Sequence, residues 1–223
     1  MRGRLLMTAV TKFLAGIALV GLLLFFPAGS LRYWNAWLFI GVLFVPMFFV
    51  GSVLLLKSPE LLEKRLKSKE TERAQKWVIG FSALLFVAGF VVAGLNFRYA
   101  WLRLPDWVSI AAAVVFFLTY GLYAEVMREN AYLSRTVEVQ KAQTVVDTGL
   151  YGLVRHPLYL VTILMFLSIP LILGSLYAFL VFLPYPLLLV KRIKNEESLL
   201  MRELEGYAEY TKKVRYRLVP YLW

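Results

Sequence analysis

The chain has 223 residues, of which 60% are hydrophobic and only 17% are charged, and its mean hydropathy is +0.67. This composition excludes an ordinary soluble domain and is typical of an integral membrane protein. With no cysteine and one histidine, the sequence also excludes disulfides, a cysteine nucleophile and metal sites built from thiolates or several histidines, so we expect no metal.

Four uncharged runs come first along the chain, at 13–31, 33–56, 77–97 and 107–124. Each is close to the ~20 residues that a membrane-spanning helix needs, so the sequence predicts four transmembrane helices. Arg2 and Arg4 precede the first run as they would in a signal peptide, but we interpret residues 1–30 as a retained first span. The charged loop 57–76 predicts a helical linker on the membrane surface, with Pro59 in its first turn.

A fifth run, 157–190, holds 34 residues without a charge. As one helix it would be roughly 50 Å long, which is too long for a ~30 Å hydrocarbon core. Pro170 and Gly174 near its middle favour a turn. We therefore expect a hairpin of two helices, about 157–172 and 175–192. Pro184 and Pro186 should kink its second arm.

The predicted helices divide the remaining sequence between two sides of a membrane, and the lysines and arginines are distributed unevenly between these sides. If the N-terminus, the linker 57–76, the segment 125–156 and the tail from 191 share one side, that side holds 22 of the 25 basic residues. The positive-inside rule then places both termini in the cytoplasm. Attraction to anionic lipids, and not nucleic-acid binding, explains the net charge of +11. We expect a multi-pass protein of a prokaryotic cytoplasmic membrane.

Polar residues gather where the hairpin begins and where it ends. The stretch GLYGLVRHPLYL, at 149–160, contains the single histidine. Because both arms return to the same side, Arg155 and His156 should enter the membrane beside Arg192 and Glu196, which leave it. These residues predict one polar site at the cytoplasmic interface. They are also compatible with basic anchors that snorkel to the interface and pair with the carboxylates.

Four motifs surround the hairpin: GxY at 149–151, RHPxY at 155–159, RxxxEE at 192–197 and GYxxY at 206–210. Together they resemble the motifs of the isoprenylcysteine carboxyl methyltransferases and the related phospholipid methyltransferases. The block RENAYLSRTVEVQ, at 128–140, is similar to the short prokaryotic members. The resemblance covers roughly residues 120–223. With the uncharged runs, it divides the chain into transmembrane helices 1–4 over 1–124, with the cytoplasmic loop 57–76, and a methyltransferase core over 125–223.

The resemblance implies S-adenosylmethionine as methyl donor, with S-adenosylhomocysteine as product, in a cytoplasmic pocket under the hairpin and tail. The fold class predicted is thus an all-α integral membrane protein with about four transmembrane helices, a C-terminal helical hairpin and this cofactor pocket. The cofactor-binding residues that it implies are Gln140, Gln143, Thr144, Val145, Val146, Tyr151, His156, Pro157, Leu158, Tyr159 and Glu196. Many members have histidine where this chain has Gln143. Arg192 corresponds to the arginine that meets the acceptor, and we add Arg155 and Glu197 as substrate-binding residues.

The chemistry expected is methyl transfer to a lipid-like, prenylcysteine-type carboxylate that enters from the bilayer. A carboxylate needs no general base, and the planar fork of Arg192 suits it. For the donor, His156 can donate a hydrogen bond to its carboxylate. Two alternatives stay open. An amine or phospholipid acceptor would need His156 or Glu197 as base. The other is a non-catalytic membrane protein of similar fold or a reductase relative with a nicotinamide cofactor; a larger basic cluster for a 2′-phosphate and a longer chain would favour the reductase.

Overall fold

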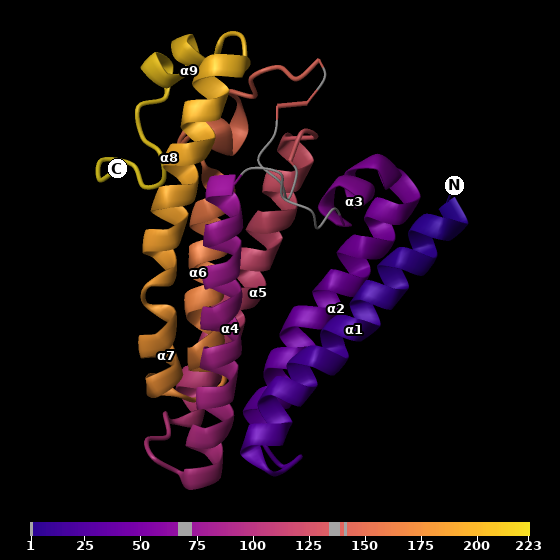
Figure 1. The fold of residues 1–223 in the computed structure, drawn as a ribbon, viewed down its shortest axis with the longest axis vertical. Coiled ribbons are helices and arrows are strands. Elements are labelled where there is room, and N and C mark those ends of the chain that lie inside the picture. The colour runs from indigo at the N-terminus through magenta and orange to yellow at the C-terminus, as the bar shows by residue number, and fades with distance from the viewer. Residues whose placement is uncertain (1, 67–72, 134–138, 141) are drawn as a thin grey trace.

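The computed structural model describes residues 2–66, 73–133, 139–140 and 142–223, and almost all of its elements are helices (Figure 1). Within this part of the chain, five helices are long and apolar enough to cross a membrane. The predicted class, an all-α multi-pass membrane protein, is confirmed. Two pieces of predicted segments lie outside the described residues, 67–72 of the linker and 134–138 of the block at 128–140.

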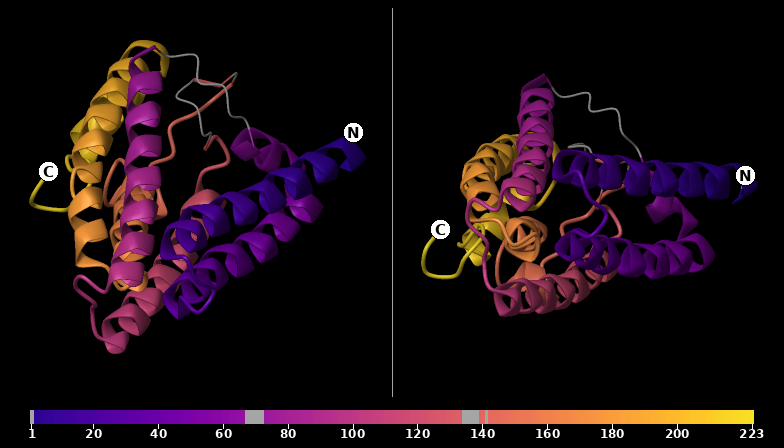
Figure 2. Two further views of the ribbon diagram at one scale, coloured as in Figure 1. Left: turned by 60° about the horizontal axis from the view of Figure 1, so that its bottom comes forward. Right: turned by 90° about the horizontal axis from the view of Figure 1, so that it is seen from below.

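The four predicted spans are present as long helices. They are α1 (Arg2–Ala28), α2 (Trp34–Lys57), α4 (Arg73–Tyr99) and α5 (Asp106–Glu129). The short α3 (Pro59–Leu66) follows α2 and begins at the expected proline. In Figures 1 and 2, α1 and α2 lie side by side and diverge from the other helices toward the end that carries the N-terminus.

The C-terminal hairpin is also present. Its first arm, α6 (Pro157–Ile172), has the predicted bounds. The second arm is longer than predicted and is divided into α7 (Leu176–Phe182) and α8 (Tyr185–Glu203). Pro184 precedes α8 directly and has no N–H to continue the hydrogen-bond ladder of α7, so the expected kink is a local interruption at residues 183–184. The two pieces together form the fifth candidate span, Leu176–Glu203, and α8 continues past residue 192 into charged sequence.

Polar side chains support the hairpin turn from neighbouring helices. Gly174 has a φ of +68°, the left-handed conformation that glycine adopts without a steric penalty. The last carbonyls of α6 accept hydrogen bonds from Tyr33 Oη at 2.6 Å, Asn35 Nδ2 at 3.1 Å and Ser109 Oγ at 3.1 Å. No water is available to such carbonyls in an apolar core, so these donors satisfy the helix end.

Aromatic packing fixes the hairpin against the preceding spans. The ring of Phe86 in α4 contacts both arms, with centroids 4.7 Å from Phe166 in α6 and 5.1 Å from Phe182 in α7. α6 also packs along α5. Both arms therefore return to one end of the bundle, where Figure 1 also places α3 and α9 (Tyr207–Lys213).

Candidate functional site

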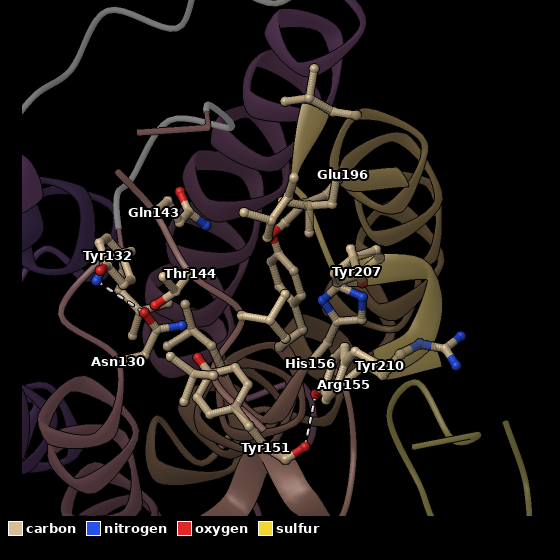
Figure 3. Close-up of a pocket in the computed structure, with 18 of the residues that line it drawn as sticks. Asn130, Tyr132, Gln143, Thr144, Tyr151, Arg155, His156, Glu196, Tyr207 and Tyr210 are labelled. Atoms are coloured by element: carbon tan, nitrogen blue, oxygen red, sulfur yellow. Dashed lines mark hydrogen bonds between the residues drawn. The ribbon is translucent and has the colours of Figure 1, made fainter. Parts of the chain in front are cut away.

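A pocket lies where the two arms of the hairpin return (Figure 3). It holds about 850 Å³ of empty space, including its open mouth. Residues that follow α5 and the segment 143–146 form one wall, while the RHPxY motif, α8 and α9 form the other. Figure 3 shows Gln143 and Thr144 across the pocket from His156 and Tyr207. Segments up to eighty residues apart in sequence thus meet here.

One hydrogen-bonded chain joins the two arms at the pocket. Nε of Arg192 donates to the hydroxyl of Tyr159 at 3.0 Å, and that hydroxyl donates to the Glu196 carboxylate. Arg192 and Glu196 are about one turn apart on α8, so both face the pocket. The sequence expectation that Arg192 and Glu196 meet the RHPxY motif at one end of the bundle is confirmed by these contacts.

A second cluster lies behind the pocket wall and is centred on Glu197, which is 8% exposed. One of its oxygens, Oε1, accepts from Arg155 Nε at 2.7 Å and lies 3.2 Å from His156 Nε2. The other oxygen, Oε2, accepts from Arg217 Nε at 2.6 Å. A buried carboxylate with these partners is held firmly, because each bond is charge-assisted.

Arg155 and the residue after it also bind the C-terminal tail. The Arg155 guanidinium points toward the tail (Figure 3), where Nη1 donates to the carbonyls of residues 214 and 215, both at 2.9 Å. The backbone N–H groups of Arg155 and His156 donate to the carbonyls of Tyr216 and Arg217 at 2.9 and 2.8 Å. The tail 214–217 is therefore attached to the RHPxY motif along its length.

The GxY motif forms a tight turn, η1 (Gly149–Gly152), against the end of α5. Gly149 has a φ of +56°, and a Cβ at this position would lie 2.0 Å from Glu129 Oε1. The other oxygen of Glu129 accepts from the N–H of Leu150 at 2.9 Å. Both the conformation and the close carboxylate therefore require glycine. The turn places Tyr151 in the pocket, where Tyr210 Oη donates to its carbonyl at 2.7 Å.

Three pocket phenols are neutral at physiological pH. Burial raises the pKa of Tyr151, Tyr207 and Tyr210 above the ordinary value of tyrosine, because a phenolate loses its hydration there. Tyr207 is 4% exposed, and its hydroxyl has no hydrogen-bond partner among the described residues. A buried donor without a partner is costly, and Tyr207 is one of the residues that line the pocket.

Most of the predicted site residues line the pocket. They are Gln143, Thr144, Val145, Val146, Tyr151, Arg155, His156, Leu158, Tyr159, Arg192 and Glu196. Three predicted residues lie outside the lining: Gln140, whose side-chain amide binds the Tyr132 carbonyl; Pro157, which begins α6; and Glu197. What each lining residue binds stays a prediction.

The substrate-binding role expected of Arg155 and Glu197 stays a prediction, and their contacts limit what either side chain can offer. The Arg155 side chain is 7% exposed and that of Glu197 is 10% exposed, and each is already bound by the other and by the tail. Arg155 lines the pocket, whereas Glu197 lies outside its lining. The sequence does not show that the tail folds back onto both residues.

Eight further residues line the pocket that sequence reasoning did not assign: Asn130, Tyr132, Leu133, Leu199, Leu200, Leu204, Tyr207 and Tyr210. A signal existed for the last five, since the leucine stripe is typical of one face of α8 and the two tyrosines three apart of one face of α9. The first three follow α5 in an irregular segment and have no periodic pattern.

The fold and the site define a multi-pass membrane protein with a polar pocket at one end of its helices. Residues 110–202 match the model of the isoprenylcysteine carboxyl methyltransferase (ICMT) family, so the predicted resemblance is confirmed over that segment. The chain is also similar to a Delta(14)-sterol reductase of Mus musculus, with 33% identity over 91 residues. That match covers 40% of this chain and 22% of the reductase, so the chain spans about a fifth of that relative.

Proposed function

We propose that this protein is a membrane methyltransferase that uses S-adenosylmethionine and methylates a lipid-like, prenylcysteine-type carboxylate. The observation that carries the proposal is the pocket at the return of the hairpin. The motif residues meet there, and the segment that matches the methyltransferase family supplies Arg192 and Glu196 to it. The donor, when bound, supplies an electrophilic methyl group on a sulfonium.

The residues present fit such a donor. The Glu196 carboxylate can accept from amino or ribose hydroxyl groups, and the unpartnered hydroxyl of Tyr207 is a buried donor. Aromatic and aliphatic side chains beside them, such as Tyr159 and Leu200, offer surfaces for a sulfonium and an adenine. Gln143 and Thr144 add amide and hydroxyl groups on the opposite wall. We therefore keep the implied cofactor-binding residues in the proposal, except that Gln140 and Pro157 would act through the residues next to them.

Arg192 is the residue that we assign to the acceptor. Its guanidinium lines the pocket and is oriented by the bond from its Nε to Tyr159 at 3.0 Å. A guanidinium can hold a carboxylate bidentately. The acceptor is already ionised at neutral pH, so the chain has to orient it but not to deprotonate it. Correct orientation of two reactants can contribute ~7–11 kcal/mol to lowering a barrier.

The location of the pocket supports a lipid-like acceptor. It lies at the beginning of α6 and the second half of α8, beside helices that are apolar enough to cross a membrane. A hydrophobic tail can therefore stay in the bilayer while its polar head reaches Arg192. By the positive-inside rule, this end and both termini face the cytoplasm, and we propose a prokaryotic cytoplasmic membrane as the location.

Similarity to the sterol reductase favours a second candidate, a reductase-like protein with a nicotinamide cofactor. A phosphorylated dinucleotide would require basic groups for its 2′-phosphate. The described pocket lining includes two arginines, and the Arg155 guanidinium is bound to Glu197 and the tail. This supports the methyltransferase over the reductase. An N-methyltransferase acting on a phospholipid or other amine remains the alternative on the same scaffold.

Calorimetric titration of the purified protein in detergent tests the proposal. We expect saturable binding of S-adenosylhomocysteine and none of reduced nicotinamide adenine dinucleotide phosphate under the same conditions. Binding of the dinucleotide alone would reverse the ranking of the two candidates.

A further inference from the structure

Arg217 lies fifteen residues beyond the segment that matches the family and outside all four motifs. Its side chain is partly exposed, at 36%, yet it is fixed at two points. Its Nε donates to Glu197 Oε2 at 2.6 Å, and its Cζ lies 5.4 Å from the ring centroid of Trp223. Arg217 is therefore a second charged partner, beside Arg155, for the Glu197 carboxylate behind the pocket wall.

Because Glu197 is held in place by Arg217, it can also orient the ring of His156. With Oε2 bound by Arg217 and Oε1 bound by Arg155, the carboxylate has one orientation, in which Oε1 also lies 3.2 Å from His156 Nε2. An ionised carboxylate only accepts hydrogen bonds, so the ring nitrogen that faces it carries the proton. Among the described residues, the other ring nitrogen, Nδ1, has no hydrogen-bond partner, and the ring lines the pocket.

We infer that Arg217 and Glu197 are positioning residues that hold His156 with Nε2–H toward Glu197 and Nδ1 toward the pocket. The tail 214–217 is then part of the binding site and not only an attachment. This inference rests on the proposed function for the identity of the bound molecule, but the orientation of the ring does not depend on it.

The ring orientation determines what His156 can bind. A neutral imidazole whose Nε2–H is directed to Glu197 offers a lone pair at Nδ1, so it accepts a hydrogen bond from the pocket and does not donate one. The amino group of the methyl donor is such a partner, whereas its carboxylate is not. The donation to a carboxylate that the sequence suggested for His156 is replaced by acceptance from an amino group.

The single histidine of the chain allows a direct test. The full-length protein is labelled with ¹⁵N-histidine, and its imidazole resonances are recorded in detergent at a pH where the ring is neutral. We expect the wild type to show one tautomer, protonated at Nε2. In Arg217→Gln the resonances should shift toward a mixture of the two tautomers, because Glu197 loses one of its fixed points.

The same samples are titrated with S-adenosylhomocysteine. Arg217→Gln should weaken binding by roughly 2- to 10-fold, the loss that follows from one hydrogen bond, and Arg217→Lys should restore part of it. The matched control is Arg215→Gln, which removes an exposed arginine side chain of the same tail and should leave both readouts at the wild-type values.

An unchanged tautomer in Arg217→Gln would overturn the inference, and so would an equal effect of Arg215→Gln, which would indicate only the charge of the tail. If the wild type binds no S-adenosylhomocysteine while Arg217→Gln still mixes the tautomers, the positioning role stands and the proposed function fails. The two proposals are therefore separable.

Discussion

Nε of Arg192 in α8 donates to the hydroxyl of Tyr159 in α6 at 3.0 Å, so the two arms of the hairpin are joined at the point where they reach the pocket. The same hydroxyl donates to Glu196. The residue assigned to the acceptor and the residue assigned to the donor are therefore connected through one phenol. A substitution at Glu196 should therefore be measurable as a change in donor binding, and a substitution at Arg192 as a change in the rate of methyl transfer.

Replacing Arg192 with lysine should impair methyl transfer far more than donor binding. Lysine keeps the positive charge but loses the planar fork that orients a carboxylate. The measurement is the transfer rate from labelled donor beside a titration with S-adenosylhomocysteine. Arg202→Lys is the matched control, since this arginine lies on the same helix and is exposed. A tolerated lysine at position 192 would favour the amine acceptor.

The pH dependence separates the same two acceptors. A carboxylate is ionised above its ~4 pKa, so the rate should vary little between about pH 6.5 and 9. Burial raises the pKa of Tyr151, Tyr207 and Tyr210, so these phenols add no titration in that range. A steep rise toward alkaline pH would instead indicate an amine, which must lose a proton before it reacts.

Glu196→Ala should weaken the binding of S-adenosylhomocysteine. Loss of one charge-assisted hydrogen bond costs about 1.5–3 kcal/mol, which corresponds to roughly 10- to 150-fold in affinity. Calorimetry on the folded variant measures this loss, with Glu203→Ala, an exposed carboxylate on the same helix, as the control. If affinity is the same in both variants, Glu196 has no place in the donor site.

Gly174→Ala should destabilise the hairpin. Gly174 has a φ of +68°, and a Cβ there would lie 3.1 Å from Asn35 Nδ2, so alanine meets both backbone strain and a close polar neighbour. A left-handed alanine costs about 1–2 kcal/mol. The thermal unfolding midpoint in detergent should fall for this variant but not for Gly41→Ala, since Gly41 lies in α2 with open space around it. Equal midpoints would show that the turn tolerates a side chain.

The ion pair between Lys213 and Asp147, at 2.6 Å, should stabilise the attachment of α9 at neutral pH and lose this effect in acid. Hydrogen bonding and the charge of Lys213 lower the pKa of Asp147 below its ordinary value, so the contribution is present above the unfolded-state pKa, about 4. It is lost as the pH falls through the folded-state pKa, which lies lower. Hydrogen exchange of α9 should be faster in Lys213→Gln than in Lys212→Gln at pH 7, and the difference should vanish in strong acid.

Uncharged length and proline positions were enough to predict the four long spans and the hairpin, whereas η1 and α9 were not predicted. The charge-free run at 157–190 could only fit the bilayer as two arms, and Gly174 marked the turn between them. The support of this turn by Tyr33, Asn35 and Ser109 could not be predicted, because single polar residues in separate spans carry no information about which helix they face.

The candidate site was predictable where motifs bring residues together and unpredictable where the tail folds back. RHPxY and RxxxEE place Tyr159, Arg192 and Glu196 in one pocket because the hairpin returns them to one side. Glu197 shares its motif with Glu196, yet it faces the tail. Only the path of residues 214–217 shows this, and their sequence has no periodicity that would position them.

The most direct test of the central claim is transfer of a labelled methyl group from S-adenosylmethionine to a prenylcysteine-type carboxylate by the purified protein, followed by alkaline treatment of the labelled lipid. A methyl ester is cleaved by base and releases its label as volatile methanol, whereas an N-methyl group is retained. The account predicts base-labile label that depends on the acceptor. Base-stable label on an amine lipid, or no transfer by a protein that binds S-adenosylhomocysteine, would contradict it.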